Sequence, residues 1–240
     1  MSNYHTKIQE VIQWQNIRQL VHFTRITNLR SIIEYGILSR QEIEKREIKV
    51  EFNDPLRLDA WPNTSSVSIT EKNIYLFPKF VERSKTSEND WFDILINPSI
   101  LTEKECIFCD TNASNHKFNG LRNDPNSLKT PEAFKGMFKE YVIRTDLVKP
   151  TPRNKKDDNL TTDPQAEICV YGIIEKEYFV LDQEVDQEAI KTEDIVSMNL
   201  KAGEISLHDN QLLHGSGPNL SDRIRAGQTM RFCPTEVKCD

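Results

Sequence analysis

Residues 17–36 read IRQLVHFTRITNLRSIIEYG, and this stretch shows both periodicities from which a fold class can be inferred. Residues 17–24 are apolar enough to form a buried strand. From Leu29 onward apolar residues recur at helical spacing, Asn28 stands at a helix N-cap position, and Gly36 stands where a C-terminal cap belongs. A strand followed at once by a short helix predicts a protein of the α+β class.

Working outward, the same reading predicts further elements on both sides of glycine, proline and asparagine breakers. Strands are expected over residues 65–70, 91–96 and 166–174, and helices over residues 37–46 and 131–141. Residues 73–80 fit a helix or a short strand. Residues 1–16 are interpreted as a short polar lead, residues 52–65 and 111–126 as loops, and residues 148–163 as an exposed mobile loop.

Composition limits the class of protein. The 240 residues are 37% hydrophobic and 28% charged, which is typical of a globular chain with one domain and an appendage. No apolar run is long enough to span a membrane and the N-terminus lacks an export signal, so a cytoplasmic location is expected. The net charge of −6 argues against non-specific coating of nucleic acid.

The cysteines do not predict a disulfide framework, because the chain has five of them, spread thinly. Cys106 and Cys109 form a CxxC pair that no second pair or histidine pair completes as a zinc site. They are interpreted as two half-buried thiols at a loop, and no metal is expected.

Several separate motifs follow one another between residues 15 and 181. They are LVHFTRITNLRSIIEYGILSR from residue 20, VEFNDPLRLD from residue 50, WFDILINPSILTEKECIFCDTNASN from residue 91, and TDPQAEICVYGIIEKEYF from residue 162. This series resembles the DarT family of toxin-type DNA ADP-ribosyltransferases. The resemblance implies an ADP-ribosyltransferase-like split β-sheet core with flanking helices over residues 1–182.

The resemblance also implies an activity, with NAD as co-substrate. ADP-ribose would pass to a base of single-stranded DNA, guanine or thymine, and the subgroup motifs favour guanine. The protein would be the toxin of a toxin–antitoxin system, opposed by an ADP-ribosyl-DNA hydrolase of macrodomain or related type. Alternatives are transfer to RNA or protein, and a catalytically weakened module that binds NAD or nucleic acid.

Carried over to this sequence, the family pattern makes Glu167 catalytic and places His22 and Thr24 against NAD, with Asn28 beside them. Breaking the nicotinamide–ribose bond passes through an oxocarbenium-like transition state, which a fixed carboxylate stabilises. An aromatic wall for the nicotinamide is expected from Tyr75, or alternatively from Phe77.

Basic residues give weaker predictions. Arg57 is expected to engage a phosphate of NAD or the acceptor base, and a salt bridge with Asp54 or Asp59 is an equally good interpretation. In the loop before Glu167, four basic residues would follow the DNA backbone, although such a run is also typical of a solvated loop. They are Lys149, Arg153, Lys155 and Lys156.

The tail, residues 186–240, has short turn-bounded strands that predict a small antiparallel β segment. The sequence from residue 199 onward resembles the C-terminal strands of phytanoyl-CoA dioxygenases, with His214 at an iron-ligand position and Arg225 at a 2-oxoglutarate position. A remote alternative is therefore a protein related to Fe(II)/2-oxoglutarate dioxygenases. No His-x-Asp motif completes an iron site, so the tail is interpreted as a partial, fused domain.

Overall fold

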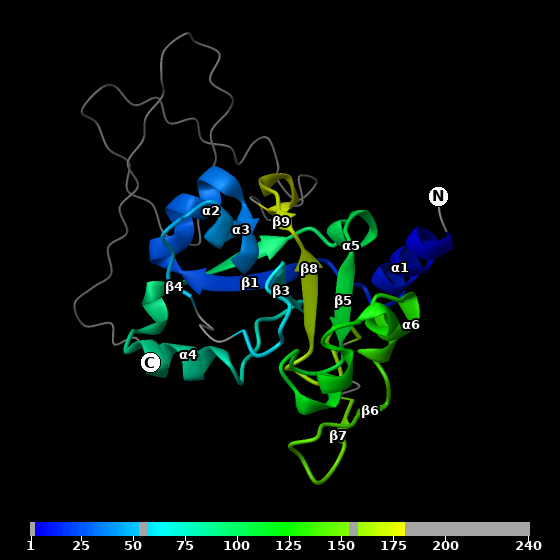
Figure 1. Cartoon of the computed structure of the whole chain (residues 1–240). Helices are drawn as coiled ribbons and strands as arrows, with labels where there is room; N and C mark the ends of the chain where they lie inside the picture. The colour runs from blue at the N-terminus through cyan, green and yellow to red at the C-terminus, as the bar shows by residue number, and fades with distance from the viewer. Residues whose placement is uncertain (1–2, 53–56, 154–157, 181–240) are drawn as a thin grey trace, which may run out of the picture. The chain divides into compact units, whose positions relative to one another are not determined.

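The computed structural model describes residues 3–52, 57–153 and 158–180, and the structural statements that follow concern these residues. Five strands form an antiparallel sheet in the order β4–β1–β3–β8–β5 (Figure 1). Their bounds are β1 Leu20–Arg25, β3 Thr64–Ile69, β4 Trp91–Ile96, β5 Cys106–Cys109 and β8 Glu167–Tyr171. The α+β class is confirmed.

The sheet divides between β1 and β3. β1 pairs with β4 along six residue pairs, but with β3 only through Leu20↔Ile69 and Val21↔Ser68. Beyond Val21 the two strands part, and Figure 1 shows β4 and β1 crossing the direction of β3, β8 and β5 at a steep angle. The split-sheet prediction is therefore confirmed, and the opening creates room for a site.

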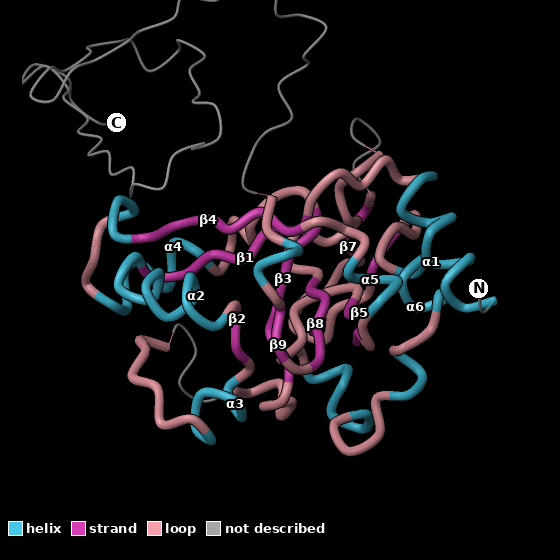
Figure 2. Tube along the Cα trace, turned by 90° about the horizontal axis from the view of Figure 1, so that it is seen from above, coloured by secondary structure: helices cyan, strands magenta, loops and turns pink. Residues whose placement is uncertain are grey.

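Helices gather at both ends of this sheet (Figure 2). Near the edge strand β5 lie α1 Asn3–Trp14, α5 Ile100–Glu103 and α6 Pro131–Gly136. Toward β1 and β4 lie α2 Leu29–Tyr35 and α4 Phe77–Ser84, and α3 Arg40–Lys45 lies beside β2 Ile37–Leu38. The short 3-10 helices are η1 Ile26–Asn28, η2 Glu88–Asp90, η3 His116–Leu121, η4 Asn126–Leu128 and η5 Lys176–Tyr178. None of the described helices is long and apolar enough to cross a membrane.

Helix α1 corrects the interpretation of residues 1–16 as a polar lead. Ile8, Val11 and Ile12 are spaced three and one residues apart, so they share one helical face, and all three are buried. They join the main core with residues of β1, β3 and α6. Tyr4, which is partly buried, packs against the same core.

Glycines set two boundaries. Gly36 ends α2 at φ +80°, and a Cβ there would lie 2.5 Å from the carbonyl oxygen of Ile174. This close approach lets β2 Ile37–Leu38 pair with β9 Ile173–Ile174. Gly172, at φ +75°, separates β8 from β9, so the single strand predicted over residues 166–174 is two strands.

Other boundaries also differ from the predictions. The helix expected over residues 131–141 ends at Gly136, because β6 Tyr141–Val142 pairs with β7 Thr151–Pro152. Strand β7 lies inside the loop expected to be mobile, where Asp163 is also buried. Residues 73–80, expected to form a helix or a short strand, enter a helix only at Phe77.

The interpretation of Cys106 and Cys109 as half-buried thiols at a loop is wrong. Cys106 and Cys109 are fully buried in β5, not half-buried in a loop, and Cys169 is buried opposite them in β8. Alternate residues of a strand face opposite sides of the sheet, so both faces of β5 are covered. Cys106 belongs to the main core, and Cys109 and Cys169 belong to a second cluster with Trp61.

Candidate active site

A cavity of about 360 Å³ opens where β1 and β3 part. Its walls come from β1, α2, β2, α3, β3 and α4, from residues 50–52 and 57–59, and from Asn112, Ser114 and Glu167. This volume is in the range of small-molecule sites. Its polar lining includes the side chains of His22, Thr24, Asn28, Arg57 and Glu167.

His22 bridges the two halves of the sheet. Its Nδ1 atom lies 2.9 Å from the carbonyl oxygen of Ser66 on β3. A carbonyl can only accept, so Nδ1 carries the proton and Nε2 retains its lone pair. Burial lowers the pKa of His22 below its ordinary value, although the Ser66 hydrogen bond and the charge of Asp93 oppose this shift. A neutral His22 therefore offers a hydrogen-bond acceptor to a hydroxyl group in the cavity.

Glu167 begins β8 on the other side of β3, and its carboxylate is held by two donors from one loop. Asn112 Nδ2 donates to Oε1 at 3.0 Å, and the backbone N–H of Ala113 donates to Oε2 at 2.9 Å. Hydrogen bonds of this kind fix the plane of a carboxylate and favour its charged form. Glu167 is thus a fixed acceptor at the cavity wall, as a role in stabilising positive charge requires.

Asn28, predicted to lie beside the residues that contact NAD, lines the cavity and also makes hydrogen bonds within the fold. Its amide donates to Thr24 Oγ1 at 3.1 Å and to the Glu51 carbonyl at 2.8 Å, and its Oδ1 accepts from the Glu51 N–H at 2.8 Å. The side chain does not cap α2, although Asn28 occupies the N-cap position. Asn28 therefore fastens residue 51 to the end of β1 and shapes the cavity, with Thr24 beside it.

Arg57 forms one of the two salt bridges considered for it, the one with Asp59. Its Nη2 atom lies 2.8 Å from Asp59 Oδ2 and donates to Thr64 Oγ1 at 3.1 Å and to the Trp61 carbonyl. The same guanidinium lines the cavity, and its buried Nε has no hydrogen-bond partner among the described residues. A buried donor without a partner favours an anionic or carbonyl-bearing ligand.

Three other predicted contacts lie away from the cavity lining. Tyr75 is 52% exposed and is not a lining residue, and Phe77 is buried outside the lining. The apolar wall comes instead from Leu76 and Phe80, four positions apart at α4. Lys149 is exposed and is not a lining residue.

Arg153 is used within the fold. It donates to the carbonyl oxygens of Leu160 and Asp158 at 3.1 and 2.9 Å and to Gln15 Oε1 at 3.0 Å. It also stacks over the ring of Phe138. These contacts fasten the loop to the residue that follows α1, so the guanidinium is not displayed for a DNA backbone. Lys155 and Lys156 lie outside the described residues.

Sequence reasoning missed Asn112, which positions the Glu167 carboxylate across a separation of 55 residues. Asn112 occurs in the quoted DTNASN stretch, but nothing local in that stretch indicates a contact with β8. It also missed Arg40, whose guanidinium stacks on Phe52 at the cavity rim, 3.4 Å from the ring centroid. Within the described part of the chain, no group of three possible metal ligands occurs.

Comparison with protein families matches residues 21–210 to DarT, described as ssDNA thymidine ADP-ribosyltransferase. This match covers well over half of the chain. The chain belongs to the DarT family. His22, Thr24, Arg57 and Glu167 all lie within the DarT match.

Among solved structures, the chain is similar to Thermosipho africanus DarTG in complex with ADP-ribose. The two are 16% identical with a TM-score of 0.41, and the match covers 68% of this chain and 42% of that one. The chain thus spans less than half the length of this DarTG structure. No curated protein matches the chain.

The DarT match also bears on the tail. It continues to residue 210, past the boundary predicted near residues 182–186. None of the comparisons supports the resemblance to phytanoyl-CoA dioxygenases. His214, Arg225 and the predicted tail strands lie outside the described residues.

Proposed function

We propose that the chain is an NAD-dependent ADP-ribosyltransferase that modifies a base of single-stranded DNA. One observation carries this proposal: His22 and Glu167 line a single cavity from opposite sides of β3, at the split in the sheet. The first is an acceptor for a ribose hydroxyl and the second is a fixed negative charge. Membership of the DarT family supports this assignment.

The reaction breaks the bond between C1′ of the nicotinamide ribose and the nicotinamide nitrogen. The bonding electrons leave with nicotinamide, and the ribose develops positive charge that Glu167 stabilises from the cavity wall. A base nitrogen then attacks C1′ and loses its proton, for which Glu167 is the nearest proposed acceptor. The products are nicotinamide, an ADP-ribosylated base and one proton.

The remaining lining residues serve binding. Neutral His22 accepts from a ribose hydroxyl, and Leu76 with Phe80 forms an apolar wall. Arg57 and Asp59 both line the cavity, and the unpartnered Nε of Arg57 suits a phosphate or a base carbonyl. We therefore assign Arg57 to ligand binding as well as to its ion pair.

For the acceptor we propose thymine first, because the family description names thymidine. The preference for guanine inferred from the subgroup motifs has no support in the comparisons. We also propose that the protein acts as a toxin and that an ADP-ribosyl-DNA hydrolase of macrodomain or related type opposes it. Exposed Lys149, with Lys155 and Lys156, is proposed to approach the DNA backbone.

The decisive experiment incubates the full chain with labelled NAD and single-stranded oligonucleotides that each lack one base. We expect label on every oligonucleotide except the one without thymine. Matched RNA and duplex DNA test the alternative acceptors, and Glu167→Gln gives the background. If RNA or protein is labelled and DNA is not, the proposed acceptor is wrong. If no mixture releases nicotinamide, the proposal of a transferase is rejected.

A further inference from the structure

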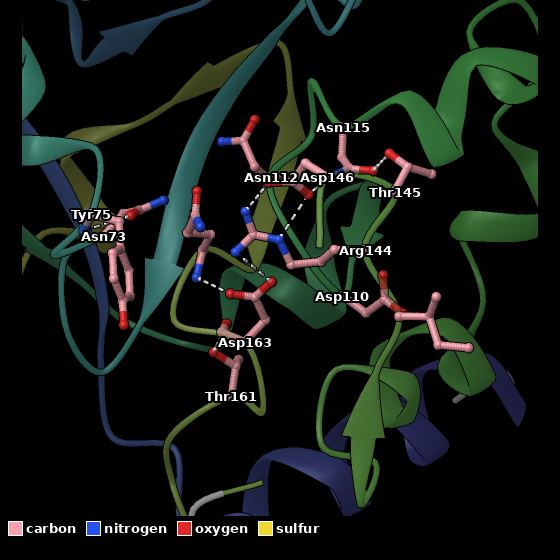
Figure 3. Close-up of polar contacts among 12 residues, drawn as sticks. Asn73, Tyr75, Asp110, Asn112, Asn115, Arg144, Thr145, Asp146, Thr161 and Asp163 are labelled. Atoms are coloured by element: carbon pink, nitrogen blue, oxygen red, sulfur yellow. Dashed lines mark hydrogen bonds and ion pairs between the residues drawn. The ribbon is translucent and has the colours of Figure 1, made fainter. Parts of the chain in front are cut away.

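A network of polar contacts joins the two segments that place Glu167 (Figure 3), and its central residues Arg144, Asp146 and Asp163 do not line the cavity. One segment is the loop of Asn112 and Ala113, which holds the carboxylate. The other is the turn over residues 161–166, which leads directly into β8. Figure 3 shows Arg144 between Asp146 and Asp163, with Asn115 and Thr145 next to Asp146.

Asp163 shapes the turn before Glu167. Its Oδ1 accepts from the Gln165 N–H at 2.9 Å, and its carbonyl accepts from the Ala166 N–H at 2.9 Å and from Thr161 Oγ1 at 2.8 Å. Asp163 is 1% exposed, and its Oδ2 has no hydrogen-bond partner among the described residues. A carboxylate so buried requires a cation nearby.

Arg144 supplies that cation and joins the turn to a second carboxylate. Its Nη1 lies 3.6 Å from Asp163 Oδ2. With the Gln165 amide oxygen turned toward it, both Nη atoms also donate to Gln165. On its other edge Arg144 grips Asp146 in a bidentate pair, with Nε donating to Oδ1 at 3.0 Å and Nη2 donating to Oδ2.

Asp146 continues the connection to the other segment. Asn115 Nδ2 donates to Asp146 Oδ1 at 2.9 Å, and Thr145 Oγ1 donates to Asn115 Oδ1 at 2.8 Å. Asn115 lies three residues after Asn112 in the loop that holds the Glu167 carboxylate. The contacts therefore form a ring, which runs from the Glu167 head group through residues 112–115 and Asp146 to Arg144 and back along residues 163–166.

We propose that Arg144 is a positioning residue, which fixes Glu167 relative to the cavity by joining the turn before it to the loop that grips its carboxylate. The proposal rests on the function proposed above. Arg144 does not line the cavity, so it acts through geometry and not by touching NAD. A displacement of about 1 Å at a reacting group can cost on the order of 100-fold in rate.

The test compares Arg144→Gln, Arg144→Lys and Asp146→Asn with wild type. We expect kcat to fall by about tenfold or more while KM for NAD stays within about twofold, because orientation is lost and NAD contacts are kept. Arg144→Lys should recover little, since an ammonium cannot form the bidentate pair. Asp146 is half-exposed, so Asp146→Asn breaks the ring with little risk to folding.

Lys129→Gln is the matched control. Lys129 forms an ion pair with Glu105 in which one side chain is largely buried and the other half-exposed, as in the pair of Arg144 and Asp146. Its loss should leave kcat unchanged. If Arg144→Gln and Asp146→Asn disrupt the same interaction, the kcat of the double variant should be no lower than that of the less active single variant. Additive effects, or equal changes in kcat and KM, would reject the positioning role.

Hydrogen–deuterium exchange provides a readout that needs no DNA substrate. Amides of residues 163–168 and 112–116 should exchange at least about tenfold faster in Arg144→Gln than in wild type or in Lys129→Gln. Unchanged exchange at both segments would overturn the inference. If wild type modifies no DNA, the proposed function fails and exchange still decides the role of Arg144. If wild type is active and Arg144→Gln matches it, the inference alone fails.

Discussion

His22 Nδ1 lies 2.9 Å from the carbonyl oxygen of Ser66, across the gap where β1 and β3 cease to pair. The side chain thus replaces the backbone contact that the two strands lose after Val21. One residue both bridges the divided sheet and lines the cavity. Its protonation state therefore affects the folded state and ligand binding together.

Lowering the pH should weaken both the stability of the fold and the binding of NAD, because His22 becomes protonated. Burial holds the pKa of His22 below 6.5, so below pH 6.5 the unfolded chain takes up a proton before the folded chain does. The stability that neutral His22 contributes is fully present above pH 6.5 and is lost as the pH falls through the lowered pKa. Protonation also removes the Nε2 lone pair, so the Kd for NAD, measured by calorimetry, should rise over the same range.

His22→Asn is the control for this pH effect, because its amide can still donate but does not titrate. In that variant the pH dependence of NAD binding should flatten. A wild-type Kd with the same pH dependence as that of His22→Asn would show that His22 does not control binding.

Replacing Glu167 by Gln should abolish transfer while leaving the protein folded. The amide is isosteric but carries no charge, so the electrostatic stabilisation of the ribose cation is lost, at a cost of about 100- to 1000-fold in kcat. The melting temperature should change little. Glu103 does not line the cavity, so Glu103→Gln is the control and should keep full activity. Turnover within about tenfold of wild type would remove Glu167 from the catalytic role.

Arg57→Gln should reduce activity more than Asp59→Asn does. Both substitutions break the same ion pair, but only the first removes the guanidinium from the cavity. Comparison of the two melting temperatures with the two Kd values for NAD separates the roles. If the two variants lose the same stability and bind NAD with the same Kd, Arg57 serves only in the salt bridge.

The pair of Arg144 and Asp146 should be visible in acid titrations. The Arg144 guanidinium lowers the pKa of Asp146 to about 2, from 3.8. Stability from this pair is therefore present above pH 3.8 and is lost as the pH falls toward about 2. Asp146 is half-exposed, so the contribution is at most about 1 kcal/mol. Carboxyl NMR should show the pKa of Asp146 returning toward its ordinary value in Arg144→Gln and remaining low in Lys129→Gln.

A chain that ends at residue 185 should retain most of its transfer activity, since every proposed site residue lies before residue 180. The matched control ends at residue 210, where the DarT match ends. Activity per mole of folded protein is the measurement. If the chain that ends at residue 210 is active and the chain that ends at residue 185 is folded but inactive, residues 186–210 are required for activity.

Local patterns were sufficient to predict β1, β4 and α2, because their periodicity and their breakers lie within a few residues. Helix α1 was not predicted, since three buried side chains among polar neighbours give a weak signal. In the site, His22 and Glu167 were predicted from motifs that resemble the DarT family, and the structure places both in the lining of one cavity. Asn112 was not found, because its partner is distant in the chain.

Two predictions failed for reasons of geometry. Tyr75 was expected to form the wall of the site, but the chain enters α4 only at Phe77, and this phase directs Leu76 and Phe80 to the cavity instead. Arg153 was expected to meet DNA because it is basic and lies in a loop. Its guanidinium instead satisfies two carbonyl oxygens and Gln15, which no local pattern could indicate.

The three buried thiols of β5 and β8 can report how often these two strands separate. Burial raises the pKa values of Cys106 and Cys109, so almost no thiolate exists at neutral pH and alkylating reagents cannot reach the sulfur atoms. In a chain with Cys233 and Cys239 replaced by serine, iodoacetamide would react only when β5 and β8 separate. The rate of alkylation then reports how often the strand that begins with Glu167 comes loose from its neighbour.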